Sequence, residues 1–356
     1  MNLSRLPLFK NSLYSLLLAS SGGILFTLLG LPIPWLLGPL LFCLAATLLA
    51  QPVSVPKPLS FPTHILIGAY IGSLLSPELL ASSLQWSSSL LVMLLLIVIS
   101  LLLVYMFYRR IADFDPPTAL FSSIPGVFST VLLLGAAAGA KIPLVTMTQC
   151  LRMTLIVVSV PFLVQGLYGG PAILPPQSGE QIISLQDLAI LLGGCTALIL
   201  CLRRLKLPAS ELACALVVSS LLYGSGTIEG ELPNWLLNSA LCILGATTGA
   251  RFERLDRRVL ARVGIHGVIA TLIAVGLAAL FALPASGLAG VSFMASWLAF
   301  MPGGIGEICA VASIFDIEPG YVAVHQLLRL FLLIALMSLW NWRSSGSRTK
   351  PQATRR

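Results

Sequence analysis

One carboxylate stands directly after a proline–glycine break in a strongly apolar stretch of the chain. In Met301-Pro302-Gly303-Gly304-Ile305-Gly306-Glu307, the proline lacks a backbone donor and the glycines reach conformations closed to other residues, so a helix should unwind there. A helix that restarts after the glycines would present free N–H groups, which suit an anion, with Glu307 in its first turn. The pattern predicts a substrate or ion site at Pro302, Gly303, Gly304 and Glu307. The alternative is a structural kink whose carboxylate is paired.

The first half of the chain contains a matching break. Adding 177 to Pro125-Gly126 gives Pro302-Gly303, and Thr130 then takes the place of Glu307. We therefore include Pro125, Gly126, Ser129 and Thr130 in the predicted site. The difference would let one hairpin hold a substrate while Glu307 carries a proton, or it reflects divergence after duplication.

Two Gln-x-x-Arg motifs follow the breaks at the same shift. Gln149 and Arg152 correspond to Gln326 and Arg329, and a spacing of three places amide and guanidinium on one helix face. Buried arginines in apolar segments normally pair with acids or a ligand. One interpretation places both guanidinium groups around an anionic substrate. In the other, Arg329 neutralises Glu307 and Arg152 braces the first hairpin.

The amino-acid composition indicates that the elements carrying these residues are membrane helices. The chain is 57% hydrophobic and 10% charged, with a mean hydropathy of +0.96, whereas soluble domains carry about 25% charged residues. We expect an all-α polytopic membrane protein with six apolar segments in each half. In the first half they lie near 13–31, 34–50, 61–76, 88–108, 118–138 and 144–165, and in the second near 186–202, 207–224, 234–250, 263–282, 291–314 and 321–342. The pairs Gly68/Gly72 and Gly245/Gly249, also related by 177, favour close helix packing over binding.

Charge placement selects a topology. If segments 118–138 and 291–314 are re-entrant or broken hairpins, each half has five crossings, and 19 of the 21 basic residues fall on the cytoplasmic side. The other two are Arg152 and Arg329. An odd number of crossings gives the halves opposite orientations, so we predict two inverted repeats with both termini cytoplasmic. The expected units are a first repeat over 1–170, an external linker over 171–185, a second repeat over 186–343 and a basic tail over 344–356.

Several function classes are disfavoured. The basic residues are scattered over short loops, so we expect no nucleic-acid partner. Seven cysteines inside apolar segments and three scattered histidines favour neither a metal site nor a cofactor. No catalytic constellation is visible, and the chain is not expected to be an enzyme.

The stretch Gly30-Leu-Pro-Ile-Pro-Trp35-Leu-Leu-Gly38-Pro39, the two Pro-Gly breaks and the duplicated Gln-x-x-Arg together resemble the AbrB-type membrane protein family. The resemblance covers essentially the whole chain and implies a multi-pass protein of the bacterial inner membrane. Members carry labels such as transcriptional regulator or ammonia monooxygenase, and neither label fits the residues visible here. The chain departs from the family at Pro208 to Cys214, which lacks the Trp and Gly-Pro of the first copy, and at Thr130, where an acid is expected.

We therefore expect a secondary transporter or exporter of a small anionic or zwitterionic solute. It would use a proton or sodium gradient, because the chain has no nucleotide-binding motif. Its partners would be the lipid bilayer, the solute and, as an open question, further copies of the chain. The alternative is a membrane-embedded regulator or sensor that influences gene expression indirectly.

Overall fold

The computed structural model describes residues 6–74, 86–126, 128–168, 182–204, 211–252 and 257–347, and within them it is all-helical. The first half contains α1 (Leu6–Leu28), α2 (Pro34–Leu48), α3 (Lys57–Ser73), α5 (Ser87–Arg110), α6 (Pro116–Ser123), α7 (Phe128–Ala137) and α8 (Ile142–Tyr168). The second contains α9 (Leu185–Arg204), α10 (Glu211–Gly224), α11 (Asn234–Ala250), α12 (Arg257–Ala289), α13 (Phe293–Phe300), α14 (Ile305–Ile314) and α15 (Pro319–Ser347). Every predicted segment is therefore helical, and each predicted hairpin is a pair of short helices.

The 177-residue repeat is visible in the helix bounds. Shifting α3, α6 and α7 by 177 gives the bounds of α11, α13 and α14. The breaks recur for a local reason, because the residue before a proline is disfavoured in the helical region. Ile124, before Pro125, has φ −67° and ψ 120°, and Met301, before Pro302, has φ −62° and ψ 134°. Each half-helix must therefore end where it does.

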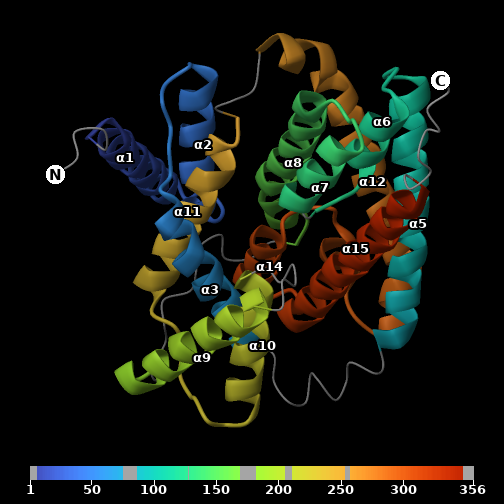
Figure 1. The fold of residues 1–356 in the computed structure, drawn as a ribbon. Helices are drawn as coiled ribbons and strands as arrows, with labels where there is room; N and C mark the ends of the chain where they lie inside the picture. The colour runs from blue at the N-terminus through green and yellow to red at the C-terminus, as the bar shows by residue number, and fades with distance from the viewer. Residues whose placement is uncertain are drawn as a thin grey trace, which may run out of the picture.

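The helices form two bundles, and each bundle takes elements from both repeats (Figure 1). We call the first the glycine-packed bundle; it consists of α1, α2, α3, α9, α10 and α11. The second, the broken-helix bundle, consists of α5 to α8 and α12 to α15. The repeats are thus interleaved in space, and neither bundle is made by one half of the chain.

The glycine-packed bundle is held by two equivalent helix crossings, α2 on α11 and α3 on α10. A Cβ added to Gly245 would lie 2.3 Å from the carbonyl oxygen of Leu36, and one added to Gly68 would lie 2.4 Å from that of Leu212. Only glycine allows backbones to approach so closely. The predicted packing role of the glycine pairs is confirmed.

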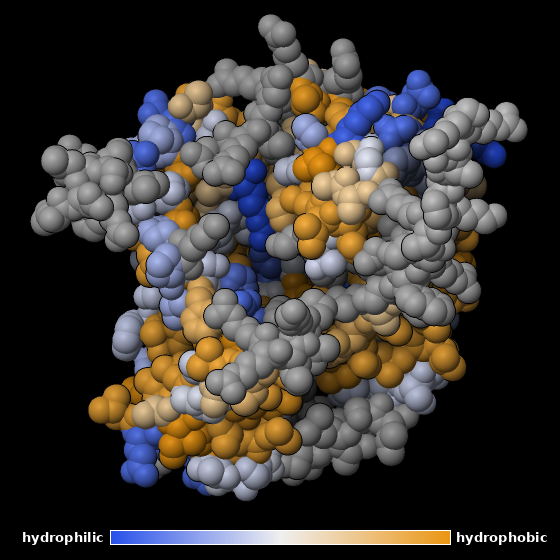
Figure 2. All heavy atoms as spheres, viewed as in Figure 1, coloured by the Kyte–Doolittle hydropathy of each residue, from blue (hydrophilic) through white to orange (hydrophobic). Residues whose placement is uncertain are grey.

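Apolar side chains cover much of the outside. Within the described residues, five helices are long and apolar enough to cross a membrane, over 11–28, 87–110, 142–167, 185–202 and 263–289. Figure 2 shows hydrophobic residues over wide areas of the surface and hydrophilic residues in the recess between the two bundles. An all-helical protein with such a surface is suited to hydrocarbon, since its backbone polar groups are satisfied within helices.

Candidate functional site

The first break is clamped by two side chains of α8. The amide nitrogen of Gln149 donates to the carbonyl oxygens of Phe121, at 3.0 Å, and Ile124, at 2.7 Å. The Nη2 atom of Arg152 donates to the carbonyl oxygen of Ile124, at 3.1 Å, and to the side-chain oxygen of Gln149. The last carbonyls of a helix have no partner within that helix, so these side chains supply what the end of α6 lacks.

The second break is clamped in the same way from α15. Gln326 donates to the carbonyl oxygens of Leu298, at 2.9 Å, and Met301, at 3.3 Å. Arg329 donates to the oxygens of Met301 and, at 2.9 Å, Gly303. The acceptors Leu298 and Met301 are the counterparts of Phe121 and Ile124. A cation beside a helix C-terminus also interacts favourably with the negative end of the helix dipole, so both arginines stabilise the ends of half-helices.

These contacts support the bracing interpretation of Arg152 and extend it to Arg329. The ion pair between Arg329 and Glu307, which belonged to the same interpretation, is not formed among the described residues. Within the described part of the chain, the ion pair that the structure contains joins Lys141 and Asp115. The guanidinium group of Arg329 instead donates to two backbone oxygens of the break.

Glu307 lies in the first turn of α14, as predicted, and is only 4% exposed. Its Oε1 accepts a hydrogen bond from the hydroxyl of Thr248 at 3.2 Å. Its carboxylate folds back over Gly304, where an added Cβ would lie 2.0 Å from Oε2. Gly304 is therefore needed for this position of the carboxylate. Thr248 belongs to α11, so the bond joins the broken-helix bundle to the glycine-packed bundle.

The corresponding place in the first repeat is different. Thr130 lies in the first turn of α7, and the counterpart of Thr248 is Ile71. Gly126 takes a positive φ of 80° at this break, which favours glycine. The side chain of Ser129 lies outside the described part. The two predicted site halves thus share their breaks and clamps but differ in polar chemistry.

The two breaks face a common crevice inside the broken-helix bundle. Its volume is about 10 Å³, which is about the space of one water molecule. The lining includes Ser123, Pro125, Arg152 and Pro302, together with Tyr108 and Thr271 from α5 and α12. Arg152 is 6% exposed and its Nε has no hydrogen-bond partner. The structure therefore separates the two arginines, since Arg152 lines this crevice and has one donor without a partner, whereas Arg329 is not part of the lining.

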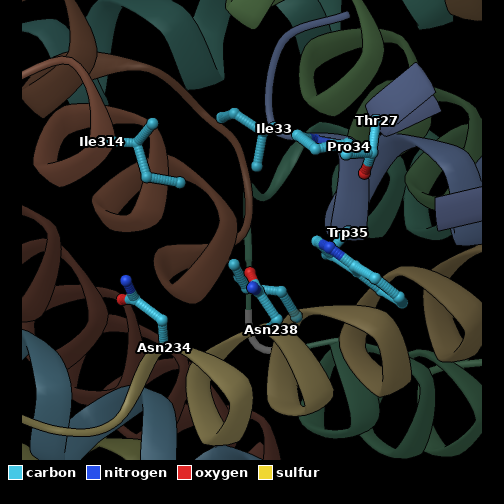
Figure 3. Close-up of a pocket in the computed structure, with 8 residues that line it drawn as sticks. Thr27, Ile33, Pro34, Trp35, Asn234, Asn238 and Ile314 are labelled. Atoms are coloured by element: carbon cyan, nitrogen blue, oxygen red, sulfur yellow. The ribbon is translucent and has the colours of Figure 1, made fainter. Parts of the chain in front are cut away.

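A second cavity, of about 80 Å³, lies between the bundles and was not expected from the sequence. Figure 3 shows Ile314, at the end of α14, opposite Pro34 and Trp35 of α2, with Asn234 and Asn238 of α11 below. The Pro-Ile-Pro-Trp stretch that resembles the family pattern thus lines an inter-bundle space. Its position marks where the two bundles are incompletely packed against each other.

Each pair of half-helices is also tied by a polar contact at the end away from its break. Asp115 caps α6 and pairs with Lys141 at 3.3 Å. The counterparts are Ser292, which caps α13, and Glu318, which accepts hydrogen bonds from the backbone and hydroxyl of Ser292 at 3.0 and 2.8 Å. Burial raises the pKa of the Asp115 carboxyl, but hydrogen bonds from Thr118 and the ion pair with Lys141 outweigh it and hold that pKa below its ordinary value. The two ties are equivalent in position, but Lys141 in the first tie and its counterpart Glu318 in the second carry opposite charges.

Comparisons with known proteins agree with this architecture. Residues 35–342 match the model of the AbrB family, described as transition state regulatory protein AbrB. The chain is 26% identical over 353 residues to the uncharacterized protein YhjN of Bacillus subtilis (strain 168), covering 91% of each chain. It is also 26% identical over 322 residues to the putative regulator AbrB of Escherichia coli (strain K12), covering 87% of this chain and 89% of the relative. Since the family model spans most of the chain, including both breaks and both clamps, the protein belongs to the AbrB family of helical membrane proteins.

Proposed function

We propose that this protein is a secondary transporter or exporter of a small anionic or zwitterionic solute. The observation that carries the proposal is the meeting of two broken helices at one crevice, with a buried arginine that has an unused donor. Broken helices from duplicated halves are a common way to build a solute site at membrane depth, because they expose backbone groups that continuous helices conceal.

The division into two bundles supports movement as the mechanism. In the glycine-packed bundle, the two equivalent crossings, α2 on α11 and α3 on α10, each join a helix of one repeat to a helix of the other. Both broken helices lie in the other bundle. We propose that this second bundle moves as a body against the first, with Glu307 and Thr248 at their boundary.

The exchange of partners also supports an inverted repeat. Helix α2 packs on α11 while α3 packs on α10, and these two pairs are exchanged by the repeat. The charges follow the same pattern, since Lys141 in one hairpin tie is replaced by Glu318 in the other. A positive residue favours the cytoplasmic side. We propose that the protein lies in the bacterial inner membrane. The Lys141 end and both termini would then face the cytoplasm, and the Glu318 end would face the outside.

Glu307 is proposed as the group that couples solute movement to an ion gradient. A buried carboxylate that touches one hydroxyl is costly to keep charged, which favours a functional role over a structural one. Arg152 is proposed to face the anionic group of the solute. Its crevice has room for about one water molecule, so solute binding requires the neighbouring helices to separate.

The test is transport by the purified full chain in liposomes. Vesicles that contain a pH-sensitive dye are given, one at a time, gradients of small carboxylates and amino acids, with sodium flux followed in parallel. At least one solute should move together with protons or sodium, and Glu307→Gln should abolish the coupled flux. The exposed Glu229, changed to Gln, is the matched carboxylate control and should keep full flux. If correctly folded protein moves none of these solutes, the proposal fails.

The name of the Escherichia coli relative supports a second candidate, a membrane-embedded regulator that changes gene expression indirectly. Such a protein would act through its cytoplasmic segments, of which the basic stretch 251–262 is the densest in charge. Scrambling 251–262 should then change expression of target genes while leaving solute flux intact. Loss of both together would favour transport as the primary activity.

A further inference from the structure

Helix α14 occupies a specific place on the glycine-packed bundle. A Cβ added to Gly306 would lie 3.3 Å from Ile67 of α3, 3.3 Å from Leu212 of α10 and 3.6 Å from Leu244 of α11. Two hydrogen bonds hold α14 there, one between the Tyr70 hydroxyl and Ser313, at 2.6 Å, and the other between Thr248 and Glu307, at 3.2 Å. We call the position defined by Ile67 and Leu244 the seat.

The pair of residues that defines the seat is symmetric although its occupant is not. Ile67 and Leu244 are counterparts under the 177-residue shift, so the repeat exchanges them, while the third contact of Gly306, Leu212, has Trp35 as its counterpart. The same shift maps Gly306 of α14 onto Ser129 of α7. The bundle therefore offers one place, built equally from both repeats, to two equivalent half-helices.

Helix α7 is elsewhere in this structure. It packs mainly on α6 and α8 of its own bundle. Its described contact with the glycine-packed bundle is at the far end of α11, where the guanidinium group of Arg251 lies 5.6 Å from the centre of the Phe128 ring. One half-helix is thus docked in the seat and its counterpart is outside it.

We infer that α7 and α14 occupy this seat in alternation, and that their exchange is the conformational step of transport. The inference rests on the transport function proposed above. With α14 seated, the hydrogen bonds Tyr70–Ser313 and Thr248–Glu307 join the two bundles through this half-helix. Seating α7 would release α14 and join the bundles through the other half-helix, which would give the alternating access that a solute carrier requires.

The two seated states are not equally held. The counterparts of Tyr70 and Ser313 are Thr247 and Ala136, and those of Thr248 and Glu307 are Ile71 and Thr130. None of the hydrogen bonds that hold α14 can form in the same way for α7. The state with α14 seated is therefore favoured at rest, and a solute or ion must supply the difference in binding free energy between the states.

Disulfide trapping tests the exchange in the full chain, in a background without the seven native cysteines. The pair Ile67→Cys with Gly306→Cys reports α14 in the seat, and Leu244→Cys with Ser129→Cys reports α7. The matched control is Leu151→Cys with Gly267→Cys, inside the broken-helix bundle, where the Cβ positions are 3.9 Å apart and within disulfide range. Each pair joins the two repeats, so cleavage at a protease site inserted within 171–181 separates the fragments unless a disulfide has formed.

Both seat pairs should cross-link, the first in higher yield. Oxidation of either should block solute flux, and reduction should restore it, while the oxidised control pair should keep flux. Restoration on reduction shows that a blocked variant is folded. Absence of the 129–244 cross-link in protein that transports would overturn the exchange and leave the transport function standing. Formation of both cross-links in protein that moves no solute would overturn transport and leave the exchange standing.

Discussion

The two hairpins of this protein have the same internal construction and different surroundings. Each half-helix ends before a proline, and each end is clamped by a Gln and an Arg one turn apart on the next long helix. Yet α14 lies against α3 and α11, held by two hydrogen bonds, while α7 stays within its own bundle. The clamp therefore makes a hairpin, and separate contacts decide where that hairpin docks.

The comparison also separates two kinds of asymmetry. The exchange of Thr130 for Glu307 is a difference of sequence, which duplication followed by divergence can produce. The position of α7 outside the seat is a difference of conformation, which movement can reverse. Four sets of substitutions distinguish these contributions, from the largest expected effect to the smallest.

The clamps should contribute most to stability, and the second more than the first. Arg329→Met removes the charged partner of two backbone oxygens, whereas Arg152→Met removes the partner of one, so we expect losses of about 3 and about 2 kcal/mol. Chemical denaturation in mixed micelles, followed by tryptophan fluorescence, measures both. Equal and small losses would show that the arginines are not the main braces of the breaks.

The glycine crossings should respond equally in the two repeats. Gly245→Ala and Gly68→Ala each place a Cβ within 2.4 Å of a backbone oxygen, and such overpacking costs about 1–3 kcal/mol. Gly276→Ala, where the added Cβ meets nothing within 4 Å, is the control and should not be destabilised by a clash. Unequal losses at Gly245 and Gly68 would contradict the equivalence of the two crossings.

The two hydrogen bonds that hold α14 in the seat should favour the state with α14 seated over the state with α7 seated. Tyr70→Phe and Thr248→Val should each raise the ratio of the 129–244 to the 67–306 cross-link about threefold, since an interhelical hydrogen bond in a membrane contributes about 0.6 kcal/mol. The neighbouring Thr247→Val is the matched control, because that hydroxyl donates to Leu244 of its own helix. An unchanged ratio in both variants would show that these hydrogen bonds do not stabilise the state in which α14 is seated.

The hairpin ties should have the smallest effect. Asp115→Ala removes a helix cap at a surface site and should cost about 0.5 kcal/mol at neutral pH, the low end for such caps. Because folding lowers the Asp115 pKa, the titratable part of its contribution is complete above the unfolded value of about 3.9 and is lost as pH falls through the folded pKa. The difference between wild type and variant should therefore shrink below about pH 4. A difference that grows on acidification would contradict the assigned direction.

Much of the fold follows from local sequence signals. The proline and glycine residues predicted the positions of both breaks, and the apolar runs predicted the twelve segments. Both signals act on the backbone over only a few residues, so they can be recognised in the sequence. The spacing of Gln149 and Arg152 predicted a shared helix face. It did not predict their acceptors, since backbone oxygens at a helix end are indistinguishable in sequence from those within a helix.

The residues that sequence reasoning missed are those whose partners lie far along the chain. Thr248 carried one local signal, a hydroxyl inside the glycine stripe of α11, but nothing indicated that it meets Glu307, 59 residues away. Tyr70 and Ser313 are separated by 243 residues. Pairings of this kind depend on how the bundles meet, which no local pattern encodes.

The sequence by itself determined an all-helical membrane chain, a 177-residue repeat and two breaks with a clamp behind each. Only the tertiary structure decided that the repeats interleave into two bundles and that α14, rather than α7, lies between Ile67 and Leu244. The reason is physical. Each repeat specifies the same local elements, so local propensity cannot choose between their equivalent docking positions, and the choice is made by a few long-range hydrogen bonds and packing contacts.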